Sequence, residues 1–188
     1  SLKYQINEGD GAFYGPKIDV KVKDAIGRQW QLATIQLDFQ LPVRFELKYT
    51  DADGSAKTPV VIHRAILGSM ERFLGVIIEH YAGAFPVWLS PVQVKLVSVA
   101  ETHIPACRAL GEELRLAGVR VEIDENNETV GNKIRKAVNE KVPYMLVIGD
   151  KEAGAPDLAV RDRGTQETRT ISRADFIKEL REKIEKYQ

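Results

Sequence analysis

The sequence has little cysteine, no charge imbalance and no long apolar run. Its one cysteine, Cys107, excludes an intrachain disulfide and suits a reducing compartment. No apolar run approaches the roughly 20 residues of a membrane-spanning helix, so we expect no membrane partner. Lys+Arg and Asp+Glu both number 27, which means that net charge does not point to a nucleic-acid partner. Any such site must depend on a local cluster of charges.

A secretory signal, an initiator methionine and internal repeats are also absent. The chain opens with SLKYQINEGD, and we therefore expect a piece of a longer protein. Its 188 residues suffice for one large domain or two small ones. The hydrophobic share of 44% and the charged share of 29% are those of an ordinary globular protein.

Two prolines mark the best domain boundary. Pro86 and Pro91 lie in AGAFPVWLSPVQV, where a helix would end and a strand would begin. We therefore predict two domains, residues 1–90 and residues 91–188, and an α/β fold class overall.

The first domain begins with a predicted antiparallel hairpin. Apolar and charged residues alternate over 17–24, a turn follows at Gly27, and a second strand covers 30–41. We expect a third strand near 44–50 and then a polar loop. Apolar residues at helical spacing predict a helix over 63–81.

Small residues lie beside an arginine on the second face of that helix. At 100° per residue Arg72 points away from the apolar stripe, and Gly68, Ser69 and Gly75 lie near it. Each glycine inside a helix costs about 0.5–1 kcal/mol relative to alanine. This face therefore indicates close approach, either by a ligand or by another structural element, and the sequence leaves both open.

The second domain alternates strands and helices. The order strand–helix–strand–helix–strand predicts a parallel core with helices on its faces. A late hairpin then makes a mixed, mainly parallel five-stranded sheet. Gly118 is expected to end the first helix, and Ser172 to cap the closing one.

Four stretches resemble the C-terminal part of bacterial-type threonyl-tRNA synthetases, and the resemblance spans essentially the whole chain. It implies the end of a class II catalytic domain, with an antiparallel sheet and a motif 3 helix. An anticodon-binding domain follows from about residue 93. The four stretches are GDGAFYGPKIDV (9–20), WQLATIQLDFQLP (30–42), HRAILGSMERFLGVIIEHYAGAFPVWLSPVQV (63–94) and VPYMLVIGDKE (142–152).

The resemblance implies a threonine–tRNA ligase that works in the cytoplasm as a homodimer. Such an enzyme activates L-threonine with ATP and Mg²⁺ and transfers it to the 3′ end of threonine tRNA. Motifs 1 and 2 of class II enzymes are not in this chain, so we expect the chain alone to be inactive. Two alternatives are a non-catalytic RNA-binding paralogue and the prolyl relative, which His63 and the threonyl-type strand disfavour.

For the threonine site, the resemblance implies contacts from Tyr14, Thr34 and Gln36 and a Zn²⁺ ligand at His63. The other two zinc ligands, a cysteine and a histidine, would lie upstream. A lone histidine is more often a packing residue, so the ligand role depends on the resemblance. Cys107 is interpreted as a small buried helix residue rather than a ligand.

For ATP, the resemblance implies contacts from Lys17, Gln31 and Arg72, with Lys17 and Arg72 as catalytic cations. Simple alternation puts Gln31 on the face opposite Thr34, so a bulge or a strand end is expected between them. The family often has a cysteine where this chain has Leu32, a change that would alter the pocket edge.

For the anticodon, the resemblance implies contacts from residues spread over the second domain. Single-stranded bases splay out and are recognised by hydrogen bonds and stacking. Lys133, Arg135 and Lys136 lie on one predicted helix and form a modest basic patch. Each of the two lysines, taken alone, is expected on a solvated helix face. The implied contacts are Val99, Asn127, Arg135, Glu152 and Arg161.

Overall fold

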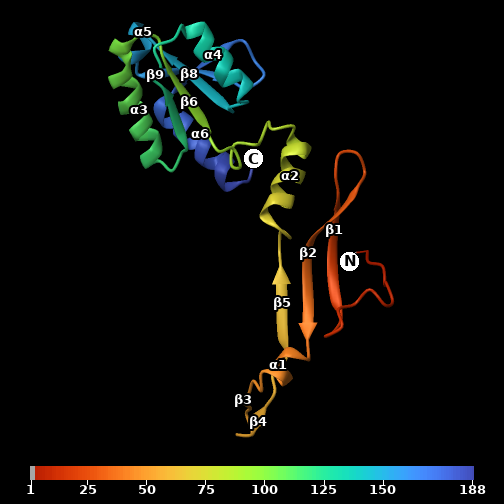
Figure 1. The fold of residues 1–188 in the computed structure, drawn as a ribbon. Coiled ribbons are helices and arrows are strands. Elements are labelled where there is room, and N and C mark those ends of the chain that lie inside the picture. The colour runs from red at the N-terminus through yellow and green to blue at the C-terminus, as the bar shows by residue number, and fades with distance from the viewer. Residues whose placement is uncertain (1–2) are drawn as a thin grey trace. The chain divides into compact units, whose positions relative to one another are not determined.

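The computed structural model describes residues 3–188, which form two compact units (Figure 1). The first unit ends at His80 and the second begins at Tyr81. The domain boundary placed between residues 90 and 91 stays a prediction. Across residues 3–188, no helix has both the length and the apolar character that crossing a bilayer requires.

A three-stranded antiparallel sheet forms the first unit, and its predicted hairpin is confirmed. The third strand of this sheet does not lie at 44–50, so that prediction was wrong. A strand some fifteen residues later in the chain takes its place beside the central strand. In sheet order, the strands are β1 (Lys17–Lys23), β2 (Gln29–Asp38) and β5 (Val61–Ala65).

A short helix and a separate small hairpin occupy the segment between β2 and β5. Pro42 stands in the first turn of the helix, where its fixed backbone angle is favourable. The Asp38 carboxylate accepts hydrogen bonds from the backbone N–H groups of Gln40 and Leu41 and so starts the helix. The elements are α1 (Leu41–Arg44), β3 (Tyr49–Thr50) and β4 (Ala56–Lys57).

The long helix of the first unit, α2 (Met70–Tyr81), begins seven residues after the predicted start at His63. His63 lies in β5, where it pairs with Gln36 of β2. Gly68 has a φ of 68°, which is incompatible with the helix. The Ser69 hydroxyl then accepts a hydrogen bond from the backbone N–H of Arg72 and caps the first turn.

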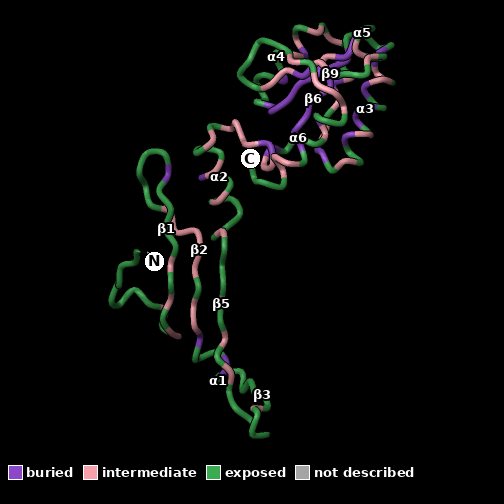
Figure 2. Tube along the Cα trace, turned by 180° about the vertical axis from the view of Figure 1, so that it is seen from behind, coloured by how far each residue is buried: buried purple, intermediate pink, exposed green. Residues whose placement is uncertain are grey.

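The pairing register separates a polar face of this sheet from an apolar one. The apolar face is open: Ile18 is 65% exposed, Ile35 41% and Ile62 63%. Figure 2 shows the first unit mostly in the colours of exposed and intermediate residues. Within the described part of this unit, Val76 and Pro42 are the apolar residues that are buried. The buried core of the chain therefore lies in the second unit.

A mixed five-stranded sheet forms the second unit, as predicted. Its order is β10-β9-β8-β6-β7, with parallel β6–β7 and β6–β8 pairs and antiparallel β8–β9 and β9–β10 pairs. The strands are β6 (Val94–Ser98), β7 (Val121–Asp124), β8 (Tyr144–Ile148), β9 (Asp157–Asp162) and β10 (Thr168–Ser172).

Helices cover both faces of this sheet (Figure 1). The larger core packs α3 and α6 against one face, and α4 covers part of the other. Gly118, with a φ of 86°, follows α3, and the Ser172 hydroxyl caps α6, so both predicted helix limits are confirmed. The helices are η1 (Glu101–His103), α3 (Ile104–Leu116), α4 (Val130–Asn139), α5 (Asp150–Ala153) and α6 (Arg173–Glu185).

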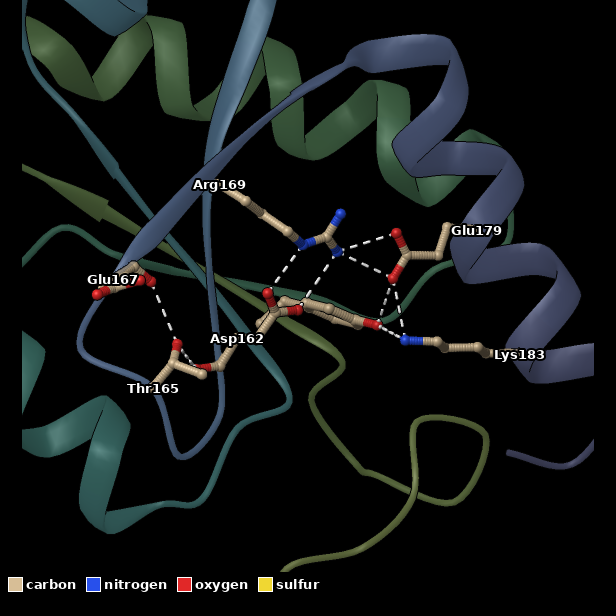
Figure 3. A network of polar contacts seen from close by, with 7 residues as sticks. Asp162, Thr165, Glu167, Arg169, Glu179 and Lys183 are labelled. Carbon is tan, nitrogen blue, oxygen red and sulfur yellow. Dashed lines mark hydrogen bonds and ion pairs between the residues drawn. The ribbon is translucent and has the colours of Figure 1, made fainter.

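A polar network joins the closing helix α6 to the sheet (Figure 3). Arg169 donates to the carboxylates of Asp162 and Glu179, and the Tyr144 hydroxyl donates to Glu179 over 2.9 Å. Burial opposes ionisation of Glu179, but hydrogen bonds from Lys183 and Tyr144 outweigh it, so the pKa of Glu179 lies below its usual value. The network therefore holds a charged carboxylate between strand and helix.

Lys133 does not lie on a solvated helix face, and that expectation was wrong. The residue is 2% exposed, on the inner side of α4. Its ammonium group donates to the carbonyl oxygens of Ser98 and Asp124, at 3.0 and 3.2 Å, and to the Ser98 hydroxyl at 3.0 Å. Lysine has three donors on a long stem, which lets it satisfy the last carbonyls of two neighbouring parallel strands.

We predict that Lys133→Met destabilises the chain by about 1–3 kcal/mol, because it removes the ammonium donors to the buried oxygen atoms of Ser98 and Asp124 while keeping an apolar stem. Lys136→Met, on the exposed side of the same helix, is the matched control and changes stability by less than about 0.5 kcal/mol. Urea unfolding at pH 7 measures both. Equal stability of the two variants would show that the buried ammonium is dispensable.

Candidate active site

The predicted threonine-site residues of the first unit converge on the polar face of the sheet. The Tyr14 hydroxyl donates to the Gln36 side-chain oxygen over 2.8 Å, and the Tyr14 and His63 rings lie 6.0 Å apart. Gln36 and His63 are register partners on neighbouring strands. A hollow of about 610 Å³ opens here, lined by Thr34, Gln36, Ile62, His63, Arg64 and Ala65.

A glycine in the N-terminal loop allows Tyr14 to reach this face. The loop lies against the end of β2, where Phe39 N–H donates to the Tyr14 carbonyl over 3.1 Å. A Cβ atom added to Gly15 would lie 2.2 Å from the carbonyl oxygen of Leu37. Only glycine permits so close an approach of the two backbones.

The expected bulge in β2 is confirmed, and it moves Gln31 onto the polar face. Val20 pairs with Ala33 and Lys21 with Gln31, so one extra residue, Leu32, lies between them. The Gln31 amide nitrogen consequently reaches the Thr34 hydroxyl at 2.8 Å and the carboxylate of Asp19 at 2.7 Å.

Asp19 holds the catalytic candidate Lys17 in place. Their ion pair spans 2.9 Å, and the hydrogen bond to Asp19 is the largest influence raising the pKa of Lys17, against the effect of burial. Burial opposes ionisation of Asp19 in turn, but hydrogen bonds from Lys17 and Thr34 keep its pKa below the usual value. Sequence reasoning missed Asp19, although its place two residues after Lys17 puts both on one face.

His63 is held by a second carboxylate that sequence reasoning missed. Its Nε2 lies 2.9 Å from the Asp38 carboxylate, whose side chain is fully buried. Burial opposes ionisation of Asp38, but hydrogen bonds from His63 and from two backbone N–H groups outweigh it and lower the pKa of Asp38. Asp38 lies two residues after Gln36 in the same strand, so the sequence alone indicated that both side chains point to one face. Within residues 3–188, Nδ1 of His63 has no hydrogen-bond partner.

The described residues do not by themselves complete a zinc site. Zinc needs three or four protein ligands, and residues 3–188 hold no group of three or more His, Cys, Asp or Glu side chains placed to bind a metal. Cys107 belongs to the second unit, and burial raises the pKa of its thiol to about 11, which disfavours the thiolate. His63 with its carboxylate partner has the donor chemistry of one ligand of such a site.

Arg72 reaches the bulge from α2. Its Nη1 donates to the Gln31 carbonyl over 3.3 Å, and its guanidinium carbon lies 5.9 Å from the centre of the Trp30 ring. Nearby, a Cβ on Gly68 would lie 3.2 Å from the carbonyl of Leu32. Gly68 therefore serves packing between elements, whereas a Cβ on Gly75 would meet nothing within 4 Å.

In the second unit, two of the five anticodon candidates lie together. Glu152 accepts a hydrogen bond from the Gly149 N–H over 3.1 Å. A Cβ on Gly149 would lie 3.3 Å from both Val99 and Glu152. Val99 follows the carboxyl end of β6 and Glu152 that of β8, which are adjacent parallel strands. Because Gly149 has no side chain, both of these side chains have room beside it at this edge of the sheet.

In the described part of the chain, no hydrogen bond or ion pair links the other three candidates to that pair. Arg161 pairs with Met145, so it occupies the sheet face on which α4 packs, and its Nε donates to the Thr165 carbonyl. Arg135 lies on the exposed side of α4, and Asn127 in the preceding loop. Among the described residues, no hydrogen bond or ion pair links these three to one another.

The predicted basic patch is smaller than the sequence indicated. Lys133 is buried, and the ammonium group of Lys136 is paired with the carboxylate of Glu128. Of the three cations in the patch, Arg135 alone is exposed and also forms no ion pair with a carboxylate within the described part of the chain.

Both units match known protein families. Residues 89–183 match the anticodon binding domain family. Residues 2–81 match the tRNA synthetase class II core domain of the G, H, P, S and T enzymes. The two matched regions follow the two compact units of the fold.

Similar proteins include threonine–tRNA ligases. One from Carboxydothermus hydrogenoformans is 55% identical over 95% of this chain and 28% of its own length. One from Clostridium acetobutylicum is 53% identical over 98% of this chain and 30% of its own length. The chain thus spans less than a third of these relatives.

A solved structure shares the fold. The crystal structure of the RNA binding domain of threonyl-tRNA synthetase from Cryptosporidium parvum Iowa II matches with a TM-score of 0.83 and 42% identity. The match covers 97% of this chain and 46% of that one.

We predict that Gly15→Ala destabilises the chain by about 1–3 kcal/mol, because the added methyl group collides with backbone atoms of β2. Gly11→Ala in the same loop is the control, since its Cβ would make only an ordinary contact at 3.5 Å. Urea unfolding measures stability, and near-UV circular dichroism reports the loop tyrosine. A Gly15→Ala variant as stable as Gly11→Ala would contradict the proposed close approach.

Proposed function

The chain belongs to the anticodon-binding domain family and carries class II synthetase core ahead of it, and we propose on this basis that it is part of a threonine–tRNA ligase. The full-length enzyme activates L-threonine with ATP and Mg²⁺, and then transfers it to the 3′ end of threonine tRNA. The observation that carries this proposal is the mutual contact of Tyr14, Gln36 and His63 on the polar face of the sheet, where Gln36 and His63 line a hollow.

Threonine recognition rests on hydrogen bonds from the sheet. Because Tyr14 donates its proton to the Gln36 carbonyl oxygen, the Gln36 amide N–H groups face the hollow without a partner among the described residues. They are free to bind polar atoms of the substrate. A site built to pair a hydroxyl rejects the analogue that lacks it, which is how valine is excluded.

ATP recognition rests on two fixed cations and an amide. Lys17 stays protonated beside Asp19, and Arg72 lies above the bulge at Gln31. Positive charges placed in advance stabilise the negative charge that develops when the threonine carboxylate attacks the α-phosphate. The planar guanidinium of Arg72 is also suited to stacking on the adenine ring.

One residue of this chain, His63, is the candidate zinc ligand. His63 would hold the ion as one ligand, while Asp38 fixes the imidazole ring through Nε2. When bound, zinc supplies a Lewis acid for the threonine alcohol, which valine lacks. The remaining ligands belong to parts of the enzyme beyond the described residues.

The second unit supplies anticodon recognition. Val99 and Glu152 form one contact region at the carboxyl ends of β6 and β8. Exposed Arg135 and Asn127 and half-buried Arg161 provide additional hydrogen-bonding groups. This arrangement suits splayed single-stranded bases, which present all their edges. A homodimeric assembly and a cytoplasmic location of the full-length enzyme are proposed from the resemblance alone.

ATP–pyrophosphate exchange tests the catalytic proposal. We predict threonine-dependent exchange by the full-length protein and none by the 188-residue chain, which lacks motifs 1 and 2. In the full-length protein Tyr14→Phe raises the KM for threonine about 3- to 10-fold, because one hydrogen bond is lost. Tyr4→Phe, at an exposed position, is the control.

Two outcomes contradict this proposal. Turnover by the 188-residue chain alone would show that the upstream motifs are not needed. A full-length protein that binds threonine tRNA but shows no exchange with threonine would favour the non-catalytic RNA-binding alternative, and exchange with proline would favour the prolyl one.

Anisotropy of a labelled anticodon stem-loop of threonine tRNA tests the second unit at fixed salt. We predict that Arg161→Ala and Arg135→Ala each weaken binding about 5- to 150-fold, the range for an arginine that contacts a base. Arg181→Ala on α6, which packs on the opposite face of the sheet, is the control. Unchanged affinity in both test variants would place the RNA-binding surface elsewhere.

A further inference from the structure

An indole ring connects the hairpin β1–β2 to the arginine of α2. Trp30 lies near the start of β2, and two guanidinium groups approach its ring. The Arg28 carbon lies 5.5 Å and the Arg72 carbon 5.9 Å from the ring centre. Both distances are within the range of a cation–π interaction.

Asp24 fixes the indole. Its carboxylate accepts a hydrogen bond from Trp30 Nε1 over 2.9 Å and one from the guanidinium of Arg28. Its other oxygen accepts from the backbone N–H groups of Ile26 and Arg28, so the turn and the ring are held together. The Asp24 side chain is only 1% exposed. Burial opposes its ionisation, but the hydrogen bonds from Trp30 and Arg28 bring the pKa of Asp24 to about 2, and the carboxylate stays charged.

The hairpin is tied to α2 independently of Trp30. Arg28 forms an ion pair with Glu79 near the C-terminal end of the helix, at 3.0 Å. The turn before the helix lies against the bulge, where Gly68 approaches the carbonyl of Leu32. The ring therefore occupies a fixed place relative to the first turn of α2, from which Arg72 extends.

Arg72 is held in place but keeps its charge available. Among the described residues its guanidinium makes one hydrogen bond, to the carbonyl of Gln31, and no ion pair. Its two contacts, a neutral carbonyl and a neutral ring, orient the cation without neutralising it. A cation of this kind has N–H donors ready for an anionic or nucleotide ligand, and its orientation costs little further entropy on binding.

We propose that Trp30 is a positioning residue for the nucleotide site, which holds the Arg72 guanidinium in its ATP-binding orientation, and that Asp24 locks the indole that does so. This inference rests on the proposed function, because Arg72 is taken to contact ATP. Trp30 itself does not touch the nucleotide and acts through Arg72.

Steady-state exchange kinetics of the full-length protein test the role of Trp30. Trp30→Leu raises the KM for ATP about 3- to 10-fold and leaves the KM for threonine within about twofold, since one orienting contact of Arg72 is lost. A general structural defect would change both constants and the unfolding free energy together. Trp88→Leu, which alters the chain's other tryptophan in the second unit, is the control and changes neither constant.

A double-mutant cycle tests whether Trp30 acts through Arg72. Affinity for a non-hydrolysable ATP analogue is measured by calorimetry for Trp30→Leu, Arg72→Ala and the double variant. We expect the double variant to bind no more weakly than Arg72→Ala alone. A further loss in the double variant, or an ATP KM unchanged in Trp30→Leu, would overturn the inference.

Two further outcomes separate a failure of the positioning role of Trp30 from a failure of the proposed ligase function. If the unmodified full-length protein shows no threonine-dependent exchange, the proposed function fails and the positioning role fails with it. If Trp30→Leu does not fold, Trp30→Phe decides, because it keeps a ring but cannot donate to Asp24. Its ATP KM rises with the threonine KM unchanged if the inference holds, and an unchanged ATP KM overturns it.

Discussion

The candidate active site depends on the pairing register of β2, the central strand of the three-stranded sheet. Because side chains alternate between faces, a shift of one residue would turn every polar group away from the hollow. The bulge at Leu32 shifts the alternation of side chains in β2 by one residue. It thereby brings Gln31 to the same face as Thr34 and Gln36. Pairing with β5 on the other side then places His63 beside Gln36. The site is therefore a property of the register rather than of any one residue.

The two units use burial in different ways. The second unit encloses a core between its sheet and the helices α3 and α6, and even a charged residue such as Lys133 is buried there with its donors satisfied. The first unit has a polar face that carries the candidate site and an apolar face that remains exposed at Ile18, Ile35 and Ile62. Exposed apolar faces of this kind are typical of surfaces that meet other protein.

Polar and charged side chains on the polar face are fixed by partners of two kinds. Lys17 and His63 each face a carboxylate, Asp19 and Asp38, which keeps them oriented. Arg72 instead has neutral partners, so its full charge stays available to a ligand. Such placement before the ligand arrives is the main source of electrostatic stabilisation in enzymes, since no reorganisation is needed during the reaction.

Local chemistry in the sequence determined the hairpin, the alternation of strands and helices in the second unit, and the limits of its helices. Gly118 and Ser172 act on their own neighbours, so no distant contact was needed to predict them. The resemblance to synthetases also rested on the sequence alone.

Only the tertiary structure decided where β5 begins and why His63 is in a strand. Its hydrogen bonds go to β2, more than twenty residues earlier in the chain, and this pairing overrides the apolar spacing that suggested a helix. The same holds for the buried ammonium of Lys133 and for the carboxylates Asp24 and Asp38. Whether a charged side chain is buried depends on which donors and acceptors the fold brings to it, and that information lies in distant segments rather than in the local pattern.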